Sequence, residues 1–322
     1  MANKTVTVKP SGGTYTTLAA VIAGELIANA DLTAMAGILN IEISGDWSGG
    51  ADTALVYITG FTESADYYLN IYTDSANQVV KTGWDATRHA LAVSDVNVIE
   101  VRQRYTRIDG LQIQYTYTDT LGSAIIYQSI AAGGTDIRIS NCRIRQAGTA
   151  DKGNGITIGD VDIDNALISN CIITGGFNRG LNSSGGSGIK VWQSVVYGMT
   201  GGYGFRGVNT TIKNSALFAT ADDIRDDGGC TIDYNATDDN DGTNNVAESG
   251  GGATWPSDFA DAANGNFTLL VDSNLNGGGT TSIIATDMDG DAYGDPASVG
   301  ADEYVAAGGG QSPVPIILQM LH

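Results

Sequence analysis

Basic residues, prolines, cysteines and long apolar runs are all scarce in this chain of 322 residues, and each scarcity narrows what the protein can be. Only 16 Lys and Arg stand against 36 Asp and Glu, and none of the 16 follows Arg225. Nucleic acid is therefore not an expected partner, because phosphate contacts need Lys and Arg. No run of 18 apolar residues occurs, so membrane insertion is not expected either.

Cysteine and histidine are too few for the commonest metal and nucleophile sites. The three cysteines contain no C-x-x-C pair, and the only histidines are His89 and His322. A zinc site and a Ser-His-Asp triad are therefore not expected, because both need cysteines or histidines that this chain largely lacks. The odd number of cysteines and the opening MANKTVTVKP, which has no apolar signal region, lead us to expect synthesis in a cytoplasm without a signal peptide.

Glycine and strand-forming residues dominate what remains. The chain has 44 Gly and 42% hydrophobic residues, with Val, Ile, Thr and Asn between the glycines. Glycine is costly inside helices but suits tight turns, so this composition predicts short strands joined by turns. From about residue 38, short runs such as ILNIEIS, ALVYITG and NVIEVRQ follow one another, each too short for a globular helix.

The beginning of the chain predicts a cap for such strands. Residues 5–9 alternate like a strand, and residues 11–27 turn through two glycines into a run with helical spacing. Thr16 or Thr17 is placed to cap this helix. The apolar residues on one of its faces are Leu18, Ala19, Ile22 and Leu26. We expect the helix to cover the open end of a stack of strands, which would otherwise be an exposed sheet edge.

An irregular repeat in the middle of the chain gives the strongest signal. Five segments align, with DYNATD (233–238) as a weaker last copy: IDGLQI (108–113), ISNCRI (139–144), ISNCII (168–173), VWQSVV (191–196) and IKNSAL (212–217). The third positions form a ladder of bend residues: Gly110, Asn141, Asn170, Gln193, Asn214 and Asn235. Their spacings of 31, 29, 23, 21 and 21 residues are typical of a solenoid.

The repeat also predicts which side chains point inward. Its first position is apolar in every copy but the last, and its sixth position is apolar in the five clear copies. We expect each of these side chains to stack on its equivalent in the next coil. Asn tolerates left-handed backbone angles and can hydrogen-bond along the stack, so the third position predicts a sharp bend.

These features resemble the right-handed parallel β-helix superfamily of pectate lyases, phage tailspikes and related surface proteins. The Asn-rich bends, the opening TVTVKPSGGTYTTLAAVIAGE, and the closing GNFTLLVDSNLNGGG, TDMDGD and VGADEY carry the resemblance. It implies an all-β chain: a right-handed parallel β-helix with an N-terminal capping helix and a short C-terminal tail. Tyr293 stands near the position where the related closing segments usually have an arginine.

The chain divides into four parts on this reading. Residues 1–37 hold the first strand and the capping helix, 38–245 the coils, 246–304 a C-terminal closing region, and 305–322 a glycine linker with an apolar tail. We expect the tail to dock into a groove on a partner, because it is apolar and too short to cross a bilayer. The docking residues are Pro313, Val314, Pro315, Ile316, Ile317, Leu318, Met320 and Leu321.

Six arginines gather on neighbouring coils of the repeat: Arg102, Arg104, Arg107, Arg138, Arg143 and Arg145. Arg107 and Arg138 occupy the same repeat position, so they should stack about 4.8 Å apart and repel one another. The repulsion has three explanations at this point. The arginines form a solvated stripe, bind an acidic glycan, or face the acidic surface of a neighbouring subunit.

Several acidic groups are candidates for metal or catalytic sites. Asp287, Asp289 and Asp291 form a D-x-D-G-D run, which is a weak candidate for Ca²⁺, and no other cofactor is expected. A second group surrounds an expected bend: Asp222, Asp223, Asp226 and Asp227. A third alternates and should share one strand face: Asp160, Asp162 and Asp164. A solvated acidic loop is the simpler interpretation of the last two.

Aromatic and cysteine side chains offer weaker hypotheses. A sugar-stacking surface could be built from Tyr115, Tyr117, Trp192, Tyr197 and Tyr203, although such residues more often pack between coils. Cys142 and Cys171 occupy equivalent positions in adjacent coils, and we expect free, buried thiols there.

We therefore predict a non-enzymatic structural protein at the surface of a phage virion, as a capsid decoration, head fibre or spike subunit. Its expected partners are capsid or other virion proteins and further copies of itself. Two alternatives stay open. One is a tailspike-type polysaccharide lyase or glycoside hydrolase acting on a host surface glycan, and the other is a bacterial surface adhesin. No residue is singled out as catalytic.

Overall fold

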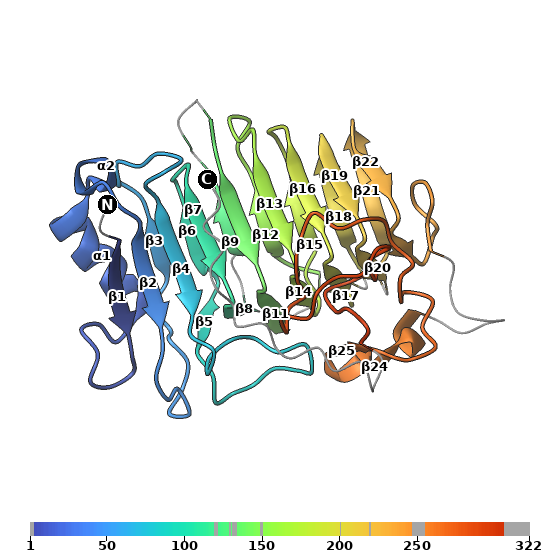
Figure 1. Cartoon of the computed structure of the whole chain (residues 1–322), viewed down its shortest axis with the longest axis horizontal. Helices are drawn as coiled ribbons and strands as arrows, with labels where there is room; N and C mark the ends of the chain where they lie inside the picture. Colours follow the sequence, from blue (N-terminus) through green and yellow to red (C-terminus); the bar gives the residue numbers. More distant parts are fainter. Residues whose placement is uncertain are drawn as a thin grey trace.

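The chain winds into one stack of coils, a parallel β-helix whose three parallel sheets run along its length (Figure 1). The computed structural model describes residues 3–118, 122–128, 130, 134–148, 151–199, 201–218, 220–246 and 255–305. Successive strands of a coil pass from sheet I to sheet II to sheet III, and each strand pairs with its equivalent in the next coil. This confirms the predicted solenoid of strands.

Sheet I has nine strands: β1 (Lys4–Val8), β2 (Leu39–Ile43), β4 (Leu69–Thr73), β7 (Thr106–Asp109), β10 (Ile137–Ser140), β13 (Ala166–Ser169), β16 (Ile189–Trp192), β19 (Thr210–Lys213) and β22 (Thr231–Asp233). Sheet II has seven: β5 (Ala90–Ser94), β8 (Gln112–Tyr117), β11 (Arg143–Gly148), β14 (Ile172–Thr174), β17 (Val195–Tyr197), β20 (Ala216–Phe218) and β23 (Ala236–Thr237). Sheet III also has seven: β3 (Val56–Ile58), β6 (Ile99–Val101), β9 (Ser123–Tyr127), β12 (Asn154–Ile158), β15 (Arg179–Ser183), β18 (Tyr203–Val208) and β21 (Asp222–Gly228).

The interior is built from columns of identical or similar apolar residues. In sheet I, Ile139 pairs in register with Ile108 on one side and with Ile168 on the other, and the column continues through Val191 to Ile212. All five side chains are at most 2% exposed. A second column follows the sixth repeat position in sheet II, and a third, unpredicted one runs through sheet III. Burial of these columns supplies the main stabilisation of the coil.

The bend between sheets I and II has the left-handed backbone that the ladder predicts, except at its last step. Positive φ angles of 43° to 75° occur at five positions: Gly110, Asn141, Asn170, Gln193 and Asn214. In the last copy the left-handed residue is Tyr234, with φ 55°, and not Asn235. Ile232 pairs with Ile212, so the copy begins at Ile232 and the predicted alignment was wrong by one residue there.

Helix α1 (Leu18–Asn29) covers the first coil, as predicted (Figure 1). Thr17 is its N-cap and accepts a hydrogen bond from the Ala20 N–H at 3.1 Å. Leu18, Val21 and Ile22 are buried against the first strands. A short helix, α2 (Leu32–Met35), follows. None of the helices in the described part of the chain is long and apolar enough to cross a membrane.

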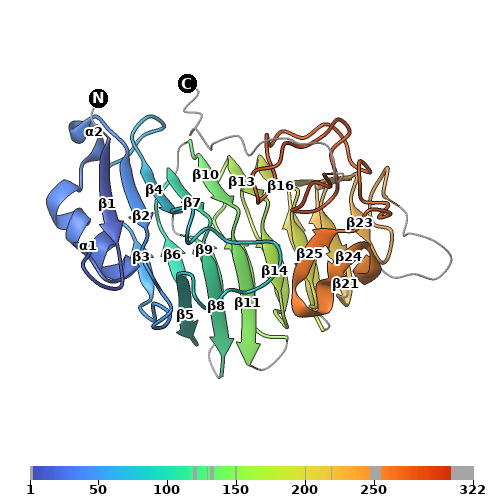
Figure 2. The same ribbon diagram turned by 60° about the horizontal axis from the view of Figure 1, so that its bottom comes forward.

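The chain after the coils folds back along the outside of the stack (Figure 2). We call residues 255–305 the closing segment. It contains η1 (Trp255–Asp258), β24 (Phe259–Asp261), η2 (Ala262–Asn264) and β25 (Asn266–Leu269). Phe259 stacks on Phe218 of sheet II with ring centres 5.5 Å apart, and Phe267 packs at 5.9 Å against Tyr197. Near Tyr197 and Phe218, sheet II is therefore covered on its outer face by the closing segment.

Candidate functional site

The six arginines of the predicted cluster divide among three faces of the coil. Arg102 and Arg104 follow β6, Arg107 and Arg138 lie on sheet I, and Arg143 and Arg145 lie on sheet II. Arg102 forms an ion pair with Glu100 at 2.8 Å and lies 5.1 Å from the Tyr57 ring. The cluster therefore does not form one binding surface, because neighbouring positions in the sequence pass from one sheet to the next.

The stacked pair on sheet I is neutralised within the chain. Arg107 and Arg138 are register partners, as the repeat predicts. Asp136 lies between them and bonds to Arg107 at 2.8 Å and to Arg138 at 3.0 Å. Partial burial raises the pKa of Asp136, but the two arginines outweigh it and lower the pKa overall. The repulsion between the arginines is thus offset by a carboxylate of the same coil, without an external anion.

The D-x-D-G-D run is held by a lysine of the chain itself. Lys81 lies 3.1 Å from Asp289 and 3.9 Å from Asp287, and its ammonium also bonds to Asp302. Asp287 is 2% exposed and accepts hydrogen bonds from the N–H groups of Asp289 and Asp291 at 2.9 and 2.8 Å. The carboxylates of Asp287 and Asp289 are therefore engaged in a turn that fastens the closing segment to the loop carrying Lys81.

The residues of the bend ladder also bind the closing segment. Asn170 donates to the Thr286 carbonyl at 2.8 Å, and Asn214 exchanges two hydrogen bonds with Thr280 at 2.8 and 2.9 Å. The hydroxyl of Tyr293, at the position of the expected arginine, donates to Asn170 at 3.0 Å. The ladder amides therefore bind the returning chain as well as one another, which the repeat alone did not indicate.

A cleft of about 300 Å³ lies over sheet II, beside the closing segment. Its floor comes from the adjacent strands β11, β14 and β17, and includes Arg145, Thr174 and Tyr197. Its walls are the loop that carries Trp84 and the turn at residues 262–265. The guanidinium of Arg145 lies over the Trp84 ring, 3.7 Å from its centre. Arg145 was a candidate binding residue from the sequence, but no local pattern indicated Trp84, which lies about 60 residues away.

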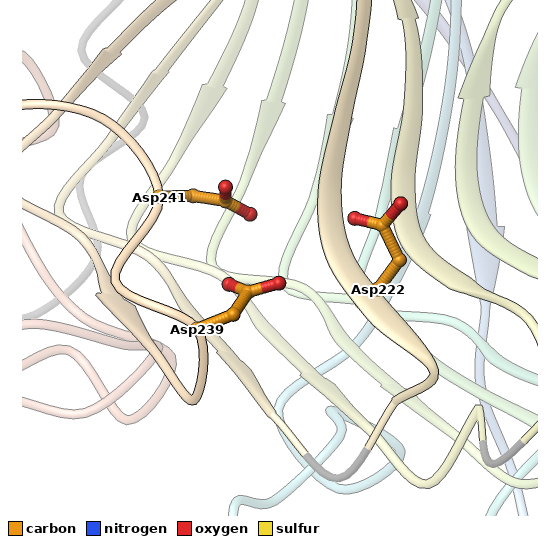
Figure 3. A group of neighbouring side chains, drawn as sticks. All are labelled: Asp222, Asp239 and Asp241. Atoms are coloured by element: carbon orange, nitrogen blue, oxygen red, sulfur yellow. The ribbon is translucent and has the colours of Figure 1, made fainter.

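Three carboxylates gather at the far end of the coil (Figure 3). Asp222 on β21 and Asp239 and Asp241 on the loop after β23 point toward one another, and their nearest oxygens lie within 4.8 Å. Burial and the charge of Asp239 raise the pKa of Asp222, and similar causes raise that of Asp241 to about 6. This acidic triad could hold a divalent cation, since carboxylate oxygens are the ligands that hard cations prefer.

Asp223 lies beside the acidic triad but points inward. The predicted bend at residues 222–227 is wrong, since these residues form strand β21. Asp223 and the adjacent Ile224 are both buried in this strand, and Asp223 is 2% exposed. Its carboxylate accepts hydrogen bonds from the Thr220 hydroxyl at 2.7 Å and from the Asp238 N–H. Burial, together with the charges of Asp238 and Asp239, outweighs these bonds and raises the pKa of Asp223 to about 7.

Because of Asp223, we expect the stability of the protein to fall as pH rises, opposite to the effect of a carboxyl with a lowered pKa. A carboxyl with a raised native pKa binds more protons in the folded than in the unfolded state, so the free energy of unfolding falls as pH rises from about 4 to about 7. Asp223→Asn should remove roughly 3 kcal/mol of this fall, as measured by urea unfolding across that range. Asp227→Asn, a change at an exposed carboxylate of the same strand, should leave the fall in place. An equal slope in Asp223→Asn and the unmodified protein would refute the assignment.

The remaining predicted groups serve the packing of loops and coils. Asp160 and Asp164 accept bonds from the Ile130 and Thr135 N–H groups, and with Asp162 they lie in the connection after β12, so the expected common strand face was wrong. Tyr115 is buried and stacks on Phe177 at 6.2 Å. Cys142 and Cys171 are free and buried. The five aromatics of the proposed stacking surface are divided among the three sheets: Trp192 lies on sheet I, Tyr115, Tyr117 and Tyr197 on sheet II, and Tyr203 on sheet III.

The apolar tail, including the predicted docking residues 313–318, 320 and 321, lies outside the described residues. Comparison with known proteins adds no relative: no family model matches the chain, and no curated protein matches it. The class that the structure itself defines is the parallel β-helix, and any function rests on the chemistry of its residues.

Proposed function

We propose that this chain is a non-enzymatic structural protein exposed on a phage virion, as a capsid decoration, head fibre or spike subunit. The observation that supports it most is the use of the charged side chains. Arg102, Arg107 and Arg138 pair with carboxylates of their own coils, and Lys81 fastens the closing segment. Groups that could have formed a catalytic centre instead hold the rod together.

The rod itself suits a particle surface. Its first coil is covered by α1, and its last strands are followed by residues 239–246, where Thr243 pairs with Asp233 beyond β22. The cap at the first coil reduces edge-to-edge association there, and the bridge at Asp233 continues the pairing beyond β22 by one residue pair. The resemblance to tailspikes and the apolar sequence of residues 313–321 then favour attachment to capsid proteins or to further copies of the chain.

The tail supplies the test of this function. Removing residues 306–322 should abolish incorporation into particles while the melting temperature of the rod stays unchanged, because the deleted residues lie beyond the coils. Incorporation is measured by particle purification and immunoblotting of the mixed phage lysate. Full incorporation of the truncated protein contradicts the proposal, and so does a chain that associates with no particle at all.

A depolymerase acting on a host glycan is the second candidate, and the acidic triad favours it. Carboxylates that lie close together can act as general acid and base on a glycosidic bond, and burial raises the pKa of Asp241 to about 6. Incubation with host capsular and lipopolysaccharide fractions tests it, since release of oligosaccharides that is lost in Asp241→Asn would replace our first proposal. An adhesin, the third candidate, would bind such fractions without cutting them.

Calcium is the cation that we propose for the acidic triad. Three carboxylates at a partly exposed site give weak binding, with a Kd of about 10⁻⁴ to 10⁻³ M. Calcium at about 5 mM should then raise the free energy of unfolding by about 1 to 2 kcal/mol over a sample in chelator. Asp239→Asn should abolish the increment, and an undiminished increment would place the ion elsewhere.

A further inference from the structure

The cleft over sheet II contains two cations with no counter-charge. Arg143 and Arg145 differ in this from the other arginines that form ion pairs: Arg88, Arg102, Arg107, Arg138, Arg206 and Arg225. Within the described part of the chain, neither Arg143 nor Arg145 forms an ion pair with a carboxylate. This is unexpected in a protein with a net charge of −20.

Arg143 is buried on the outer face of sheet II, and its hydrogen-bond partners are neutral. Its side chain belongs to a residue that is 3% exposed, and it donates to the carbonyls of Val80 at 3.2 Å, Lys81 at 3.4 Å and Gly265. Burial, and then the charge of Arg145, lower the pKa of Arg143 to about 10. A buried charge is unfavourable until an opposite charge offsets it, so an anion in the cleft would be stabilised by both guanidiniums.

Arg145 is held in place for such an anion. Its Nε donates to Gln114 at 2.8 Å, and its guanidinium plane rests on Trp84. This leaves the Nη groups of Arg145 without a hydrogen-bond partner among the described residues, while the side chain loses little freedom on binding. Arginine groups presented in this way bind planar carboxylates through two parallel hydrogen bonds.

The surroundings of the arginines indicate the rest of the ligand. Thr174, Asn264 and the half-buried Tyr197 line the same cleft, and the Asn264 side-chain amide donates to Asp261 at 2.8 Å. Hydroxyl and amide groups hydrogen-bond to sugar hydroxyls, and an aromatic ring packs against a sugar's apolar face. The volume of about 300 Å³ is at the lower end of the range for small-molecule sites.

We propose that this cleft binds the carboxylate of an acidic sugar residue, with Arg145 as the principal contact and Trp84 as its support. The inference is independent of the proposed function, because a sugar site on sheet II requires neither a particle nor catalysis. It also differs from the acidic triad, which lies at the far end of the coil.

A matched pair of sugars tests the site. Calorimetric titration of the full chain at low salt should show binding of cellobiouronic acid, and binding of cellobiose, which lacks only the carboxylate, should be at least about tenfold weaker. Arg145→Gln should weaken the acidic sugar by about tenfold without changing the melting temperature appreciably, since Arg145 is partly exposed. Arg206→Gln, on sheet III, is the control and should leave binding unchanged.

Other results overturn the proposal. Equal affinity for the two sugars would show that the carboxylate is not recognised. Tighter binding of inorganic phosphate or of an aspartate-containing tripeptide would make this a site for another class of anion. An Arg145→Gln variant that is folded and binds cellobiouronic acid like the unmodified protein would place the sugar elsewhere.

Discussion

Replacing Ile168 by Ala is expected to lower the free energy of unfolding by about 3 to 4 kcal/mol. Ile168 on β13 is 2% exposed and stacks between Ile139 and Val191 of the neighbouring coils. The shorter side chain leaves a cavity that the coils above and below cannot close, because their backbones are fixed by ladder hydrogen bonds on both sides. Urea unfolding followed by circular dichroism measures the change.

The matched control lies one residue away on the same strand. Leu167 points outward and is half-buried, so Leu167→Ala should cost about 1 kcal/mol or less. The difference between the two variants reports the alternation of β13 directly. Similar losses for Leu167→Ala and Ile168→Ala would contradict the inward column.

The second large effect is expected at Lys81, where Lys81→Met should destabilise the attachment of the closing segment by about 3 to 5 kcal/mol. The substitution leaves Asp287 and Asp302, both 2% exposed, without their cation. Burial raises the pKa of both carboxyls even beside Lys81, and that of Asp287 reaches about 7. Without the lysine, both should take up protons, so the loss should be larger at pH 8 than at pH 5.

Hydrogen exchange read by mass spectrometry locates this effect. Peptides covering residues 259–269 and 287–303 should exchange faster in Lys81→Met, while those of β10 and β13 in the coil change little. Lys190→Met is the control, because Lys190 on β16 is exposed. Protection of the closing segment that survives Lys81→Met at pH 8 would show that the apolar contacts of Phe259 and Phe267 suffice without the ion pairs.

The coil was predictable because its determinants repeat. Stacking requires the same side-chain type at equivalent positions, so Ile139, Ile168 and Ile212 recur before a left-handed bend. The last copy was misaligned because Tyr234 occupies the left-handed position that Gly, Asn or Gln occupies in the other copies. The adjacent Asn235 was therefore wrongly aligned with the bend residues. Its side-chain amide bonds to the Ser215 N–H and to the Ile212 carbonyl.

The sites were less predictable because they depend on contacts between distant segments. Lys81 meets Asp302 and Asp289 across more than 200 residues, and no local pattern encodes that contact. Trp84 reaches Arg145 from a loop for the same reason. The arginines looked like a single cluster because they are close in the sequence, although the chain turns from sheet I to sheet II between them. Asp223 was assigned to a solvated acidic loop around a bend, because a strand of mostly acidic residues resembles a loop in the sequence.

The spacing of outward positions along sheet I tests the architecture most directly. Asn40 lies five register steps from Lys190 and six from Thr211. Nitroxide pairs at these positions, in a Cys230→Ser background, should give narrow distances of about 24 and 29 Å by pulsed EPR, because each step adds about 4.8 Å. Two distances that fail to increase by about one strand spacing, or broad distributions for both pairs, would contradict the stacked coil.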